Sequence, residues 1–359
     1  MLSDCKLSIV VPVYNGSPYI EHCMDDLVKQ TFQDWEAIFV NDGSTDGSGE
    51  LLDRTAVRDK RFEAIHQNNG GTARARNAGL VHAKGQYITF LDVDDELDPQ
   101  IYEKLIHLMD ETGADMGVCG YYFKIERITE EGPVTTYLEE KTYPSCLLKG
   151  QEAIKEKLVD LWDKDLLHNV WNKLYRMDLI REKGLRYRDG HIYTEDRVFN
   201  RQFIENCNSI AVTEECLYYY IRERTGSTSE KFRDDYFTIR HKEYCEFRTH
   251  FKNLGMWDET VQEYVCREFT ERIAGCIENI FHAEKCLSEK GKRSRIAELI
   301  VHPDVREAVK HSKCKSRKMR LLVFPIKIKS VALTYLIYKT VYTVRKQNPA
   351  LFHKLKSKR

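Results

Sequence analysis

The first hundred residues alternate short apolar runs with stretches of helical periodicity, and this alternation limits the fold more than any other feature of the chain. Four runs have strand character: 7–13, 35–40, 61–67 and 87–91. Each of the first three ends in a polar turn, and a helical pattern follows it. Strands that alternate with helices indicate a parallel, doubly wound α/β sheet whose ligand lies at the carboxyl ends of the strands.

The fourth run ends in a burst of acids, Asp92-Val93-Asp94-Asp95-Glu96. Carboxylates this close together raise each other's pKa unless a cation lies between them, and a divalent metal with oxygen ligands commonly fills that role. The alternative is a helix N-terminus, because Asp98-Pro99 follows and acids are favoured in a first turn. We assign Glu96 and Asp98 to the helix and predict that Asp92 and Asp94 serve the metal.

After a helix at 99–111 and a strand at 115–124 the alternation stops. Residues 125–150 are polar and are predicted to be irregular, whereas 211–221 reads as a strand and 234–300 as helical. We therefore predict two halves of one α/β domain, a helical region and a tail, at 1–125, 126–230, 231–310 and 311–359. The helical region could form a homo-oligomer, cover a binding site or support the tail.

The formal net charge of zero hides a strong asymmetry. Residues 311–359 hold 14 Lys and Arg and no Asp or Glu, out of 56 and 56 in the whole chain, so residues 1–310 carry −14. Such a split indicates an anionic partner for the tail alone. The longest uncharged run in the tail, 330–338, is far shorter than the roughly 20 residues that span a bilayer.

Basic side chains interleaved with Tyr, Leu, Ile and Phe predict that residues 311–359 form an interfacial helix on an anionic membrane surface. Each basic residue near such a surface contributes roughly 1 kcal/mol to binding. A nucleic-acid arm and a solvated pair of basic helices are the alternatives. The density of aromatic and aliphatic residues favours lipid, so no nucleic-acid partner is expected.

The eleven cysteines do not form a recognisable framework, since their number is odd and none lies in a C-x-x-C pair. We interpret them as reduced thiols of a cytosolic protein rather than as disulfides or zinc ligands. Met1 leads directly into a strand by Leu7, which leaves no room for a signal peptide.

Three common motifs for nucleotides and metals do not fit this chain. No G-x-x-x-x-G-K-[ST] sequence is present, which excludes a P-loop. Gly47-Ser48-Gly49 follows a strand, but no third glycine completes a dinucleotide fingerprint. Residues 42–53 are similar to a calcium loop, yet a strand precedes them where an EF-hand requires a helix.

Five short motifs follow one another in a fixed order. They are Val11-Pro12-Val13-Tyr14-Asn15, Asn41-Asp42-Gly43-Ser44-Thr45-Asp46, Gly71-Thr72-Ala73-Arg74-Ala75-Arg76-Asn77, Leu91-Asp92-Val93-Asp94-Asp95 and Thr194-Glu195-Asp196. Together they resemble the family 2 glycosyltransferases, which have the Rossmann-like GT-A fold, over residues 7 to about 230. Each motif alone is weak, whereas the set is highly specific. The helical region and the basic tail lie outside the resemblance.

The resemblance implies a binding site for a nucleotide-sugar donor. Asp42 would accept a hydrogen bond from the uracil of a UDP-sugar, and Pro12 and Tyr14 would line the base pocket. Arg76 would lie near the nucleotide and Asp92 would face the ribose. The residues alone also allow an Asx turn at Asp42, a buried turn at Pro12 and a surface salt bridge at Arg76.

The resemblance also implies a metal and a base. Asp94, the last residue of the D-x-D motif, would hold Mn²⁺ or Mg²⁺ against the two phosphates, where the cation acts as a Lewis acid. Asp196 would be the catalytic base of an inverting transfer, and Glu195 would orient it or contact the acceptor. A helix N-cap is the alternative for Asp196, because its motif precedes the apolar Val198-Phe199.

Two further pairs of residues are candidates for the site. Arg222 and Arg224, on a loop rich in Gly, Ser and Thr, could close over the diphosphate. Trp162 and Trp171 are interpreted as core residues rather than as platforms for a sugar ring.

The expected function is an inverting, metal-dependent hexosyltransferase that acts on a UDP-sugar at the cytoplasmic face of the plasma membrane. Its acceptor would be a hydroxyl group of a lipid-linked oligosaccharide or a polymeric glycan, in the biosynthesis of a capsule or another cell-surface polysaccharide. A teichoic-acid polymer is the nearest variant. The alternative is a catalytically inactive nucleotide-binding scaffold of a membrane assembly.

Overall fold

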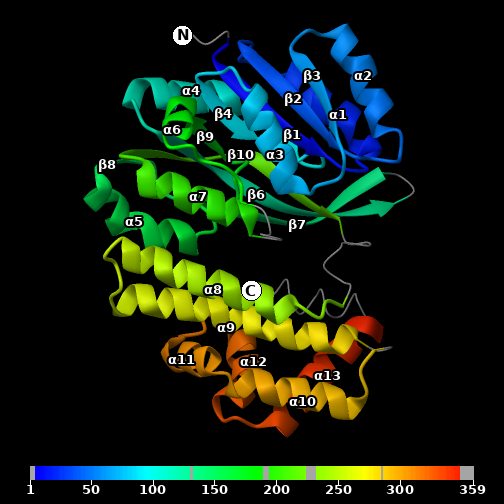
Figure 1. Ribbon diagram of the computed structural model, residues 1–359, viewed down its shortest axis with the longest axis vertical. Coiled ribbons are helices and arrows are strands. Elements are labelled where there is room, and N and C mark those ends of the chain that lie inside the picture. Colours follow the sequence, from blue (N-terminus) through cyan, green and yellow to red (C-terminus); the bar gives the residue numbers. More distant parts are fainter. Residues whose placement is uncertain (1–4, 130–131, 189–193, 224–231, 284–285, 348–359) are drawn as a thin grey trace. The chain divides into compact units, whose positions relative to one another are not determined.

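A mixed ten-stranded sheet forms the centre of the first of two compact units (Figure 1). The computed structural model describes residues 5–129, 132–188, 194–223, 232–283 and 286–347. The first unit spans Met1–Arg224, and the second, which is helical, spans Thr225–Arg359.

The first four strands are parallel to one another and lie in the order β3-β2-β1-β4. They are β1 (Leu7–Val13), β2 (Trp35–Asp42), β3 (Phe62–Gln67) and β4 (Tyr87–Phe90). The apolar residues of β1 are buried along nearly its whole length, as expected of a strand covered on both faces. The connecting helices are α1 (Ser17–Val28), α2 (Ser48–Arg58) and α3 (Thr72–His82). The predicted doubly wound α/β fold is confirmed.

The second half of the sheet mixes parallel and antiparallel pairs. β9 lies antiparallel between β4 and β6, and β6 is parallel to β10. The strands are β5 (Glu96–Leu97), β6 (Met116–Thr129), β7 (Gly132–Lys141), β8 (Cys146–Lys149), β9 (Lys173–Arg176) and β10 (Ser209–Glu223). The helices are α4 (Ile101–Thr112), α5 (Gln151–Asp163), α6 (Met177–Glu182) and α7 (Glu195–Asn206).

The prediction that residues 125–150 are irregular is wrong. β6 continues to Thr129, β7 pairs with it in an antiparallel hairpin, and β8 pairs with β10. The side chains of Val134 and Leu138 on β7 are 49% and 53% exposed. An antiparallel edge that faces water needs no continuous apolar run, and so its polar composition resembles that of a loop.

A cluster of aromatic rings fixes α7 against the sheet. The ring of Tyr187 stacks on that of Phe199 on α7, with centroids 4.5 Å apart. Both rings meet Phe90 of β4 edge to face, at 5.2 and 5.5 Å. Such aromatic pairs add to the energy of burial, so the first turn of α7 has a rigid support beside the end of β4.

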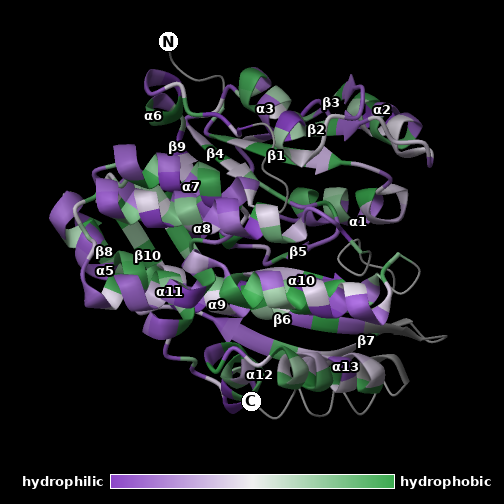
Figure 2. Cartoon of the chain, turned by 60° about the horizontal axis from the view of Figure 1, so that its bottom comes forward, coloured by the Kyte–Doolittle hydropathy of each residue, from purple (hydrophilic) through white to green (hydrophobic). Residues whose placement is uncertain are grey.

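The second unit consists of helices arranged around a buried α9. They are α8 (Tyr236–Asn253), α9 (Glu259–His282), α10 (Glu289–Val301), α11 (Pro303–His311), α12 (Arg317–Lys327) and α13 (Val331–Gln347). The predicted four-residue periodicity of α9 is confirmed, because every residue of the series is buried: Val261, Val265, Phe269, Ile273, Ile277 and Phe281. Hydrophobic and hydrophilic residues alternate along α10 and α13 (Figure 2).

Much of the basic tail folds into this helical unit. The buried apolar residues of α12 and α13 include Leu322, Val323, Ile326, Tyr335 and Tyr338. The sequence predicted that this segment lies on a membrane surface; in the structure its apolar residues are divided between the unit's core and its surface. None of the described helices combines the length and the apolar composition required to cross a membrane. All eleven cysteines are free thiols.

Candidate active site

The buried guanidinium of Arg76 joins three segments that are distant in the sequence. Arg76 lies on α3, and its side chain is 3% exposed. Its Nη2 donates to Oδ1 of Asp92, after β4, at 2.9 Å, and its Nη1 pairs with Oδ1 of Asp196 on α7. The structure therefore brings these three predicted site residues together. The ion pairs are partly buried, with the guanidinium inside and the carboxylates partly exposed, whereas the alternative considered for Arg76 was a surface salt bridge.

Tyr187, in the segment before α7, and Asn77, on α3, hold Arg76 in place. The guanidinium lies over the ring of Tyr187, 5.4 Å from its centroid, which is a cation–π contact. Asn77 fixes the backbone of Tyr187 with its side-chain amide, which donates to the carbonyl at 2.8 Å and accepts from the N–H at 2.9 Å. Sequence reasoning included Asn77 only as part of a motif and missed Tyr187.

Asp196 occupies the first turn of α7, where carboxylates are favoured by the helix dipole. Burial raises the pKa of Asp196 to about 7, against the opposing effect of Arg76. A carboxylate with such a pKa can accept a proton near neutral pH. The N-cap position belongs to Thr194, whose side chain makes no capping hydrogen bond, so Asp196 itself is not the cap. The neighbouring Glu195 has a buried Oε2 without a hydrogen-bond partner among the described residues.

The acids that follow β4 have three different environments. Asp92 is partly exposed and pairs with Arg76, whereas Asp94 is exposed. Asp95 is buried and accepts hydrogen bonds from the Tyr218 hydroxyl at 2.6 Å and the Ile221 N–H at 2.8 Å. Burial, together with the charges of Asp92 and Asp94, raises the pKa of Asp95 well above its usual range.

This acid cluster fits a hard divalent cation. The carboxylate of Asp94 is exposed at the edge of the sheet, and carboxylate oxygens are the ligands that Mg²⁺ and Mn²⁺ prefer. A cation there would also offset the mutual repulsion that raises the pKa of Asp95. Asp95 itself faces β10, so Asp94 is the better candidate ligand. Glu96 lies in β5 and pairs with Lys124 at 2.9 Å, so its assignment to the following helix is wrong.

Asp42 ends β2 and anchors the loop that leads into α3. Its Oδ1 accepts hydrogen bonds from Gln67 Nε2 at 2.7 Å and Gly70 N at 2.8 Å, and its Oδ2 accepts from Gly71 N at 2.7 Å. Gly71 has a φ of 84°, which favours glycine at this turn. Asp42 thus clamps a neighbouring loop instead of closing its own Asx turn, and its contact with a uracil ring stays a prediction.

The loops that follow β1 and β2 are tied to each other. Asn15, with a φ of 51°, accepts a hydrogen bond from Thr45 N at 2.8 Å and donates its own N–H to Ser44 Oγ at 2.9 Å. Pro12 is partly buried in β1, and the side chain of Tyr14 is 57% exposed. An exposed ring on a fixed loop suits the predicted contact with a flat base.

A network of buried polar groups behind α7 escaped sequence reasoning. Lys173 of β9 is fully buried, and its ammonium donates to the carbonyl of Asn169 at 2.6 Å and to Asn172 Oδ1 at 2.5 Å. Burial lowers its pKa to about 7. The Tyr175 hydroxyl donates to Oδ1 of Asn200 on α7 at 2.6 Å. The sequence feature that could have indicated this network is the mixture of aromatic and polar residues in the segment 169–176.

The arginines predicted for a loop are not placed as expected. Arg222 is exposed within β10, opposite Ile125 of β6, and so the prediction that it lies on a loop is wrong. β10 extends further than the apolar pattern indicated because β6 pairs with its polar end. Arg224 lies outside the described residues. Trp162 and Trp171 are 0% and 3% exposed, in agreement with their interpretation as core residues.

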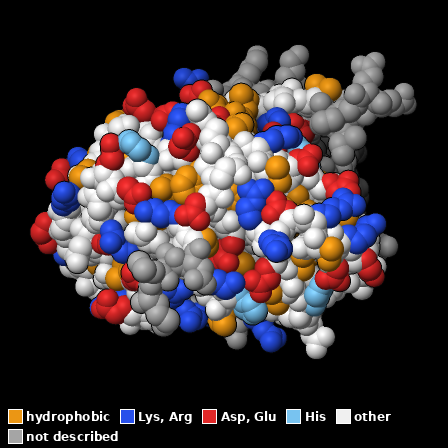
Figure 3. Space-filling view, turned by 90° about the horizontal axis from the view of Figure 1, so that it is seen from above, with side chains coloured by type: hydrophobic (Ala, Val, Ile, Leu, Met, Phe, Trp, Pro, Cys, Tyr) orange, Lys and Arg blue, Asp and Glu red, His pale blue; other side chains and the backbone are white. Residues whose placement is uncertain are grey.

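Charges of both signs are interspersed on the face of the molecule seen in Figure 3, as far as the described residues show. Apolar side chains are scattered among them. The electrostatic field over this face is therefore mixed in sign.

Comparisons with known proteins agree with this architecture. Residues 8–182 match the model of the family described as Glycosyl transferase family 2. The glycosyltransferase EpsJ of Bacillus subtilis is 30% identical over 320 residues, which cover 87% of this chain and 88% of EpsJ. The poly(ribitol-phosphate) beta-glucosyltransferase of Bacillus spizizenii is 30% identical over 226 residues, which cover 62% of this chain and 33% of that protein.

Solved structures show the same fold. S. aureus TarS 1-349 in complex with UDP-GlcNAc superposes with a TM-score of 0.63 and 19% sequence identity. The superposition covers 94% of this chain and 92% of that chain, so it includes the helical region as well as the sheet.

Proposed function

Since the chain belongs to glycosyltransferase family 2, we propose that it transfers a sugar, with inversion, from a UDP-sugar to a hydroxyl group of a glycan acceptor. The observation that carries this proposal is the convergence of Arg76, Asp92 and Asp196 beside the acids that follow β4. The proposal is supported by the closeness of the Arg76 guanidinium to the Asp92 carboxylate and to the Asp196 carboxyl, whose pKa is raised.

The donor half of the proposal rests on the ends of β1, β2 and β4. Asp42 would bind the uracil ring, Pro12 and Tyr14 would contact the base, and Asp92 would face the ribose. The TarS structure in complex with UDP-GlcNAc supports a UDP-sugar as donor. Asp94 would hold Mn²⁺ or Mg²⁺, which when bound stabilises the negative charge of the departing diphosphate as a Lewis acid.

Asp196 supplies the base in the proposed reaction. Its carboxylate takes the proton of the acceptor hydroxyl while that oxygen bonds to the anomeric carbon from the face opposite the phosphate. The bond between the anomeric carbon and the phosphate oxygen breaks, and UDP leaves with the electron pair. Arg76 orients the carboxylate, and Glu195, whose Oε2 is buried without a partner in the described structure, would orient it further or contact the acceptor.

We propose a lipid-linked or polymeric glycan of the cell surface as the acceptor. The similarity to a poly(ribitol-phosphate) beta-glucosyltransferase supports a polymeric acceptor, including the teichoic-acid variant. The basic helices of the tail support an acceptor at the cytoplasmic face of the plasma membrane. Leu321, Phe324 and Ile328, on or next to α12, are 61%, 52% and 52% exposed and could contact lipid.

Release of UDP from a panel of UDP-sugars, with and without Mn²⁺, tests this function. We expect turnover with one donor, and its loss when a chelator removes the metal. Binding of UDP without turnover, in the presence of a glycan acceptor, would favour the inactive scaffold. Turnover that is unaffected by the chelator would remove Asp94 from the mechanism.

A further inference from the structure

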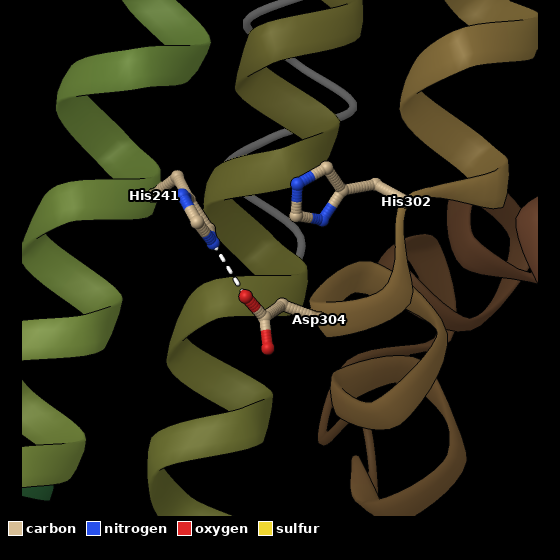
Figure 4. Close-up of side chains that lie close together, drawn as sticks. All are labelled: His241, His302 and Asp304. Carbon is tan, nitrogen blue, oxygen red and sulfur yellow. Dashed lines mark hydrogen bonds and ion pairs between the residues drawn. The ribbon is translucent and has the colours of Figure 1, made fainter.

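The helical unit contains a second group of metal-ligating side chains, separate from the acids that follow β4. His241 of α8, His302 at the junction of α10 and α11, and Asp304 in the first turn of α11 form this group. One donor atom from each side chain lies within 4.8 Å of the others. Figure 4 shows the three side chains converging from two segments of the unit. We call them the His–His–Asp cluster.

We propose that the His–His–Asp cluster binds a transition-metal dication, with Zn²⁺ as the best match. Imidazole nitrogen and carboxylate oxygen are both common zinc ligands, and three protein ligands leave a fourth position for water or a further side chain. Magnesium and manganese prefer oxygen ligands, so the cluster and Asp94 would select different metals.

The distances require only small side-chain movements for a metal to enter. Nε2 of His241 and Oδ2 of Asp304 are 2.6 Å apart, as a hydrogen bond without metal. In a tetrahedral site with bonds of about 2.0–2.3 Å, ligand atoms lie roughly 3.3–3.8 Å apart. This pair would therefore open by less than about 1 Å, and the third donor would move inward from within 4.8 Å.

The hydrogen bond between His241 and Asp304 explains why these two side chains lie together, but it does not explain the position of His302. Nδ1 of His302 is buried and has no hydrogen-bond partner among the described residues. A buried imidazole nitrogen without a partner is costly, because it has lost its contact with water. The rings of His241 and His302 meet edge to face with centroids 4.7 Å apart, so the His302 imidazole lies against the cluster. A bound metal would relieve that cost.

The surroundings of the cluster resemble those of a metal site. Arg248 Nη1 lies 3.3 Å from Oδ1 of Asp304, which fixes the carboxylate and leaves Oδ2 directed at His241. The ring of Phe237 lies 5.7 Å from that of His241 and 5.2 Å from that of His302. Outer partners that orient the ligands and an apolar wall are typical of zinc sites in proteins.

One neighbouring cysteine could occupy the fourth position. Cys245 follows His241 by one turn of α8, and its Sγ lies 3.6 Å from His241 Nε2. This contact is a hydrogen bond in the structure, and the thiol lies outside the group of three donors, so it would have to move to become a ligand. Occupied by Zn²⁺, the cluster would fasten α8 to the junction of α10 and α11.

Metal binding by the untagged full-length protein tests this proposal. The protein is stripped with a chelator, dialysed, and titrated with Co²⁺ or Zn²⁺ without nucleotide, since a tetrahedral Co²⁺ site has strong visible absorption. We expect one equivalent to bind to the wild type, with an increase in the melting temperature. His302→Ala and Asp304→Asn should lose both the bound equivalent and the metal-dependent increase.

His311→Ala is the matched control, because His311 ends α11 outside the cluster. It should bind metal as the wild type does. Asp304→Asn keeps the size of the side chain and its ability to hydrogen-bond, so it separates loss of a ligand from loss of the fold. A wild type that binds no equivalent of Co²⁺ or Zn²⁺ would overturn the proposal, as would equal binding by folded His302→Ala.

Discussion

Arg76 and Asp196 are 120 residues apart in the sequence, yet their side chains form a partly buried ion pair. The guanidinium comes from α3, which is anchored through its leading loop to β2. The carboxylate comes from the first turn of α7, which the aromatic cluster holds against β4. The pair thus links the proposed donor site to the proposed base by a direct contact. The second ion pair of Arg76, with Asp92, links both to the end of β4.

Replacement of Arg76 by leucine should destabilise the fold. The change leaves Asp92 and Asp196 facing each other without a cation. Breaking a fully buried pair costs about 3–5 kcal/mol, and the loss here should lie below that because the two carboxylates are partly exposed. Since Asp196 titrates near pH 7, the loss should be largest at pH 8 and smaller at pH 5, where this carboxyl is protonated in the wild type. Denaturant unfolding at both pH values measures the difference.

Arg74→Leu is the matched control for this variant, because Arg74 lies on the same helix and is exposed. Its effect on the free energy of unfolding should stay within about 0.5 kcal/mol. Equal losses for Arg74→Leu and Arg76→Leu would show that the ion pairs of Arg76 contribute nothing specific to stability.

Asp196→Asn should abolish transfer while preserving the affinity for the donor. An amide cannot accept the proton of the acceptor hydroxyl, and removal of a general base lowers kcat by about 100- to 10,000-fold. Isothermal titration with a non-hydrolysed UDP-sugar gives the affinity, and UDP release gives kcat. Asp178→Asn, an exposed acid on α6, serves as the control. Transfer that survives in Asp196→Asn would assign the base elsewhere.

The pH dependence of the wild type should report the same carboxyl. The pKa of Asp196 is raised to about 7, and a base acts only when it is deprotonated. The value of kcat/KM should therefore fall below pH 7, by about tenfold per pH unit, and level off above it. A profile that stays flat from pH 5 to pH 8 would contradict this assignment.

The parallel half of the sheet could be predicted because each of its strands is recognisable from a short stretch of sequence. Both faces of β1, β2 and β4 are covered, so each strand is a continuous apolar run that stands out from the polar turns around it. The direction of parallel strands then determines that Asp42 and Asp92 share one edge. The meeting of Arg76 with Asp196 could be expected only from the resemblance to a family, since no local pattern encodes it.

Long-range contacts explain what the sequence did not predict. The hairpin of β6 and β7 faces water and lacks an apolar signature. The burial of Lys173 depends on carbonyl groups that only the folded loop 166–172 presents. The apolar residues of the tail looked like a lipid-binding face, but Leu322, Val323 and Ile326 have protein partners in the helical unit.

Asp94 and Asp95 should respond differently to the same conservative change. Asp94→Asn removes the proposed metal ligand and should raise the Mn²⁺ concentration for half-maximal turnover by at least about tenfold. Asp95→Asn should leave that concentration unchanged, because Asp95 faces Tyr218 and Ile221. A titration of turnover with Mn²⁺ compares the two variants, and an equal response would contradict the assignment of Asp94.

Asp95→Asn should also be more stable than the wild type, by a margin that grows as the pH rises. Burial raises the pKa of Asp95 in the native state above the value of about 3.8 that the same side chain has in the unfolded chain. The wild type therefore loses stability as the pH rises above about 3.8. Asparagine carries no charge and can still bond to Tyr218 and Ile221. Its free energy of unfolding relative to the wild type should increase from pH 4 to pH 8, whereas Asp95→Ala should lose about 1–3 kcal/mol through unsatisfied partners.

The membrane proposal for the tail is best tested without deleting it. Removal of residues 311–359 would also remove Leu322, Val323 and Ile326 from the core of the helical unit, and loss of binding would then reflect unfolding. The exposed residues Leu321 and Phe324, with Ile328 after the helix, recur at helical spacing and offer a surface whose loss spares the core.

The triple variant Leu321→Ser, Phe324→Ser and Ile328→Ser should lose most of its binding to vesicles that contain an anionic lipid. Full burial of one such side chain contributes about 1.5–3 kcal/mol, so partial insertion of three should change the partition coefficient by at least about tenfold.

Val57→Ser replaces an 86% exposed apolar residue of α2 and should bind as the wild type does. Added salt should weaken wild-type binding, because the neighbouring Lys327 and Lys329 attract the anionic surface through screened charges. Equal co-sedimentation of the folded triple variant and the Val57→Ser control would mean that these side chains do not contact lipid.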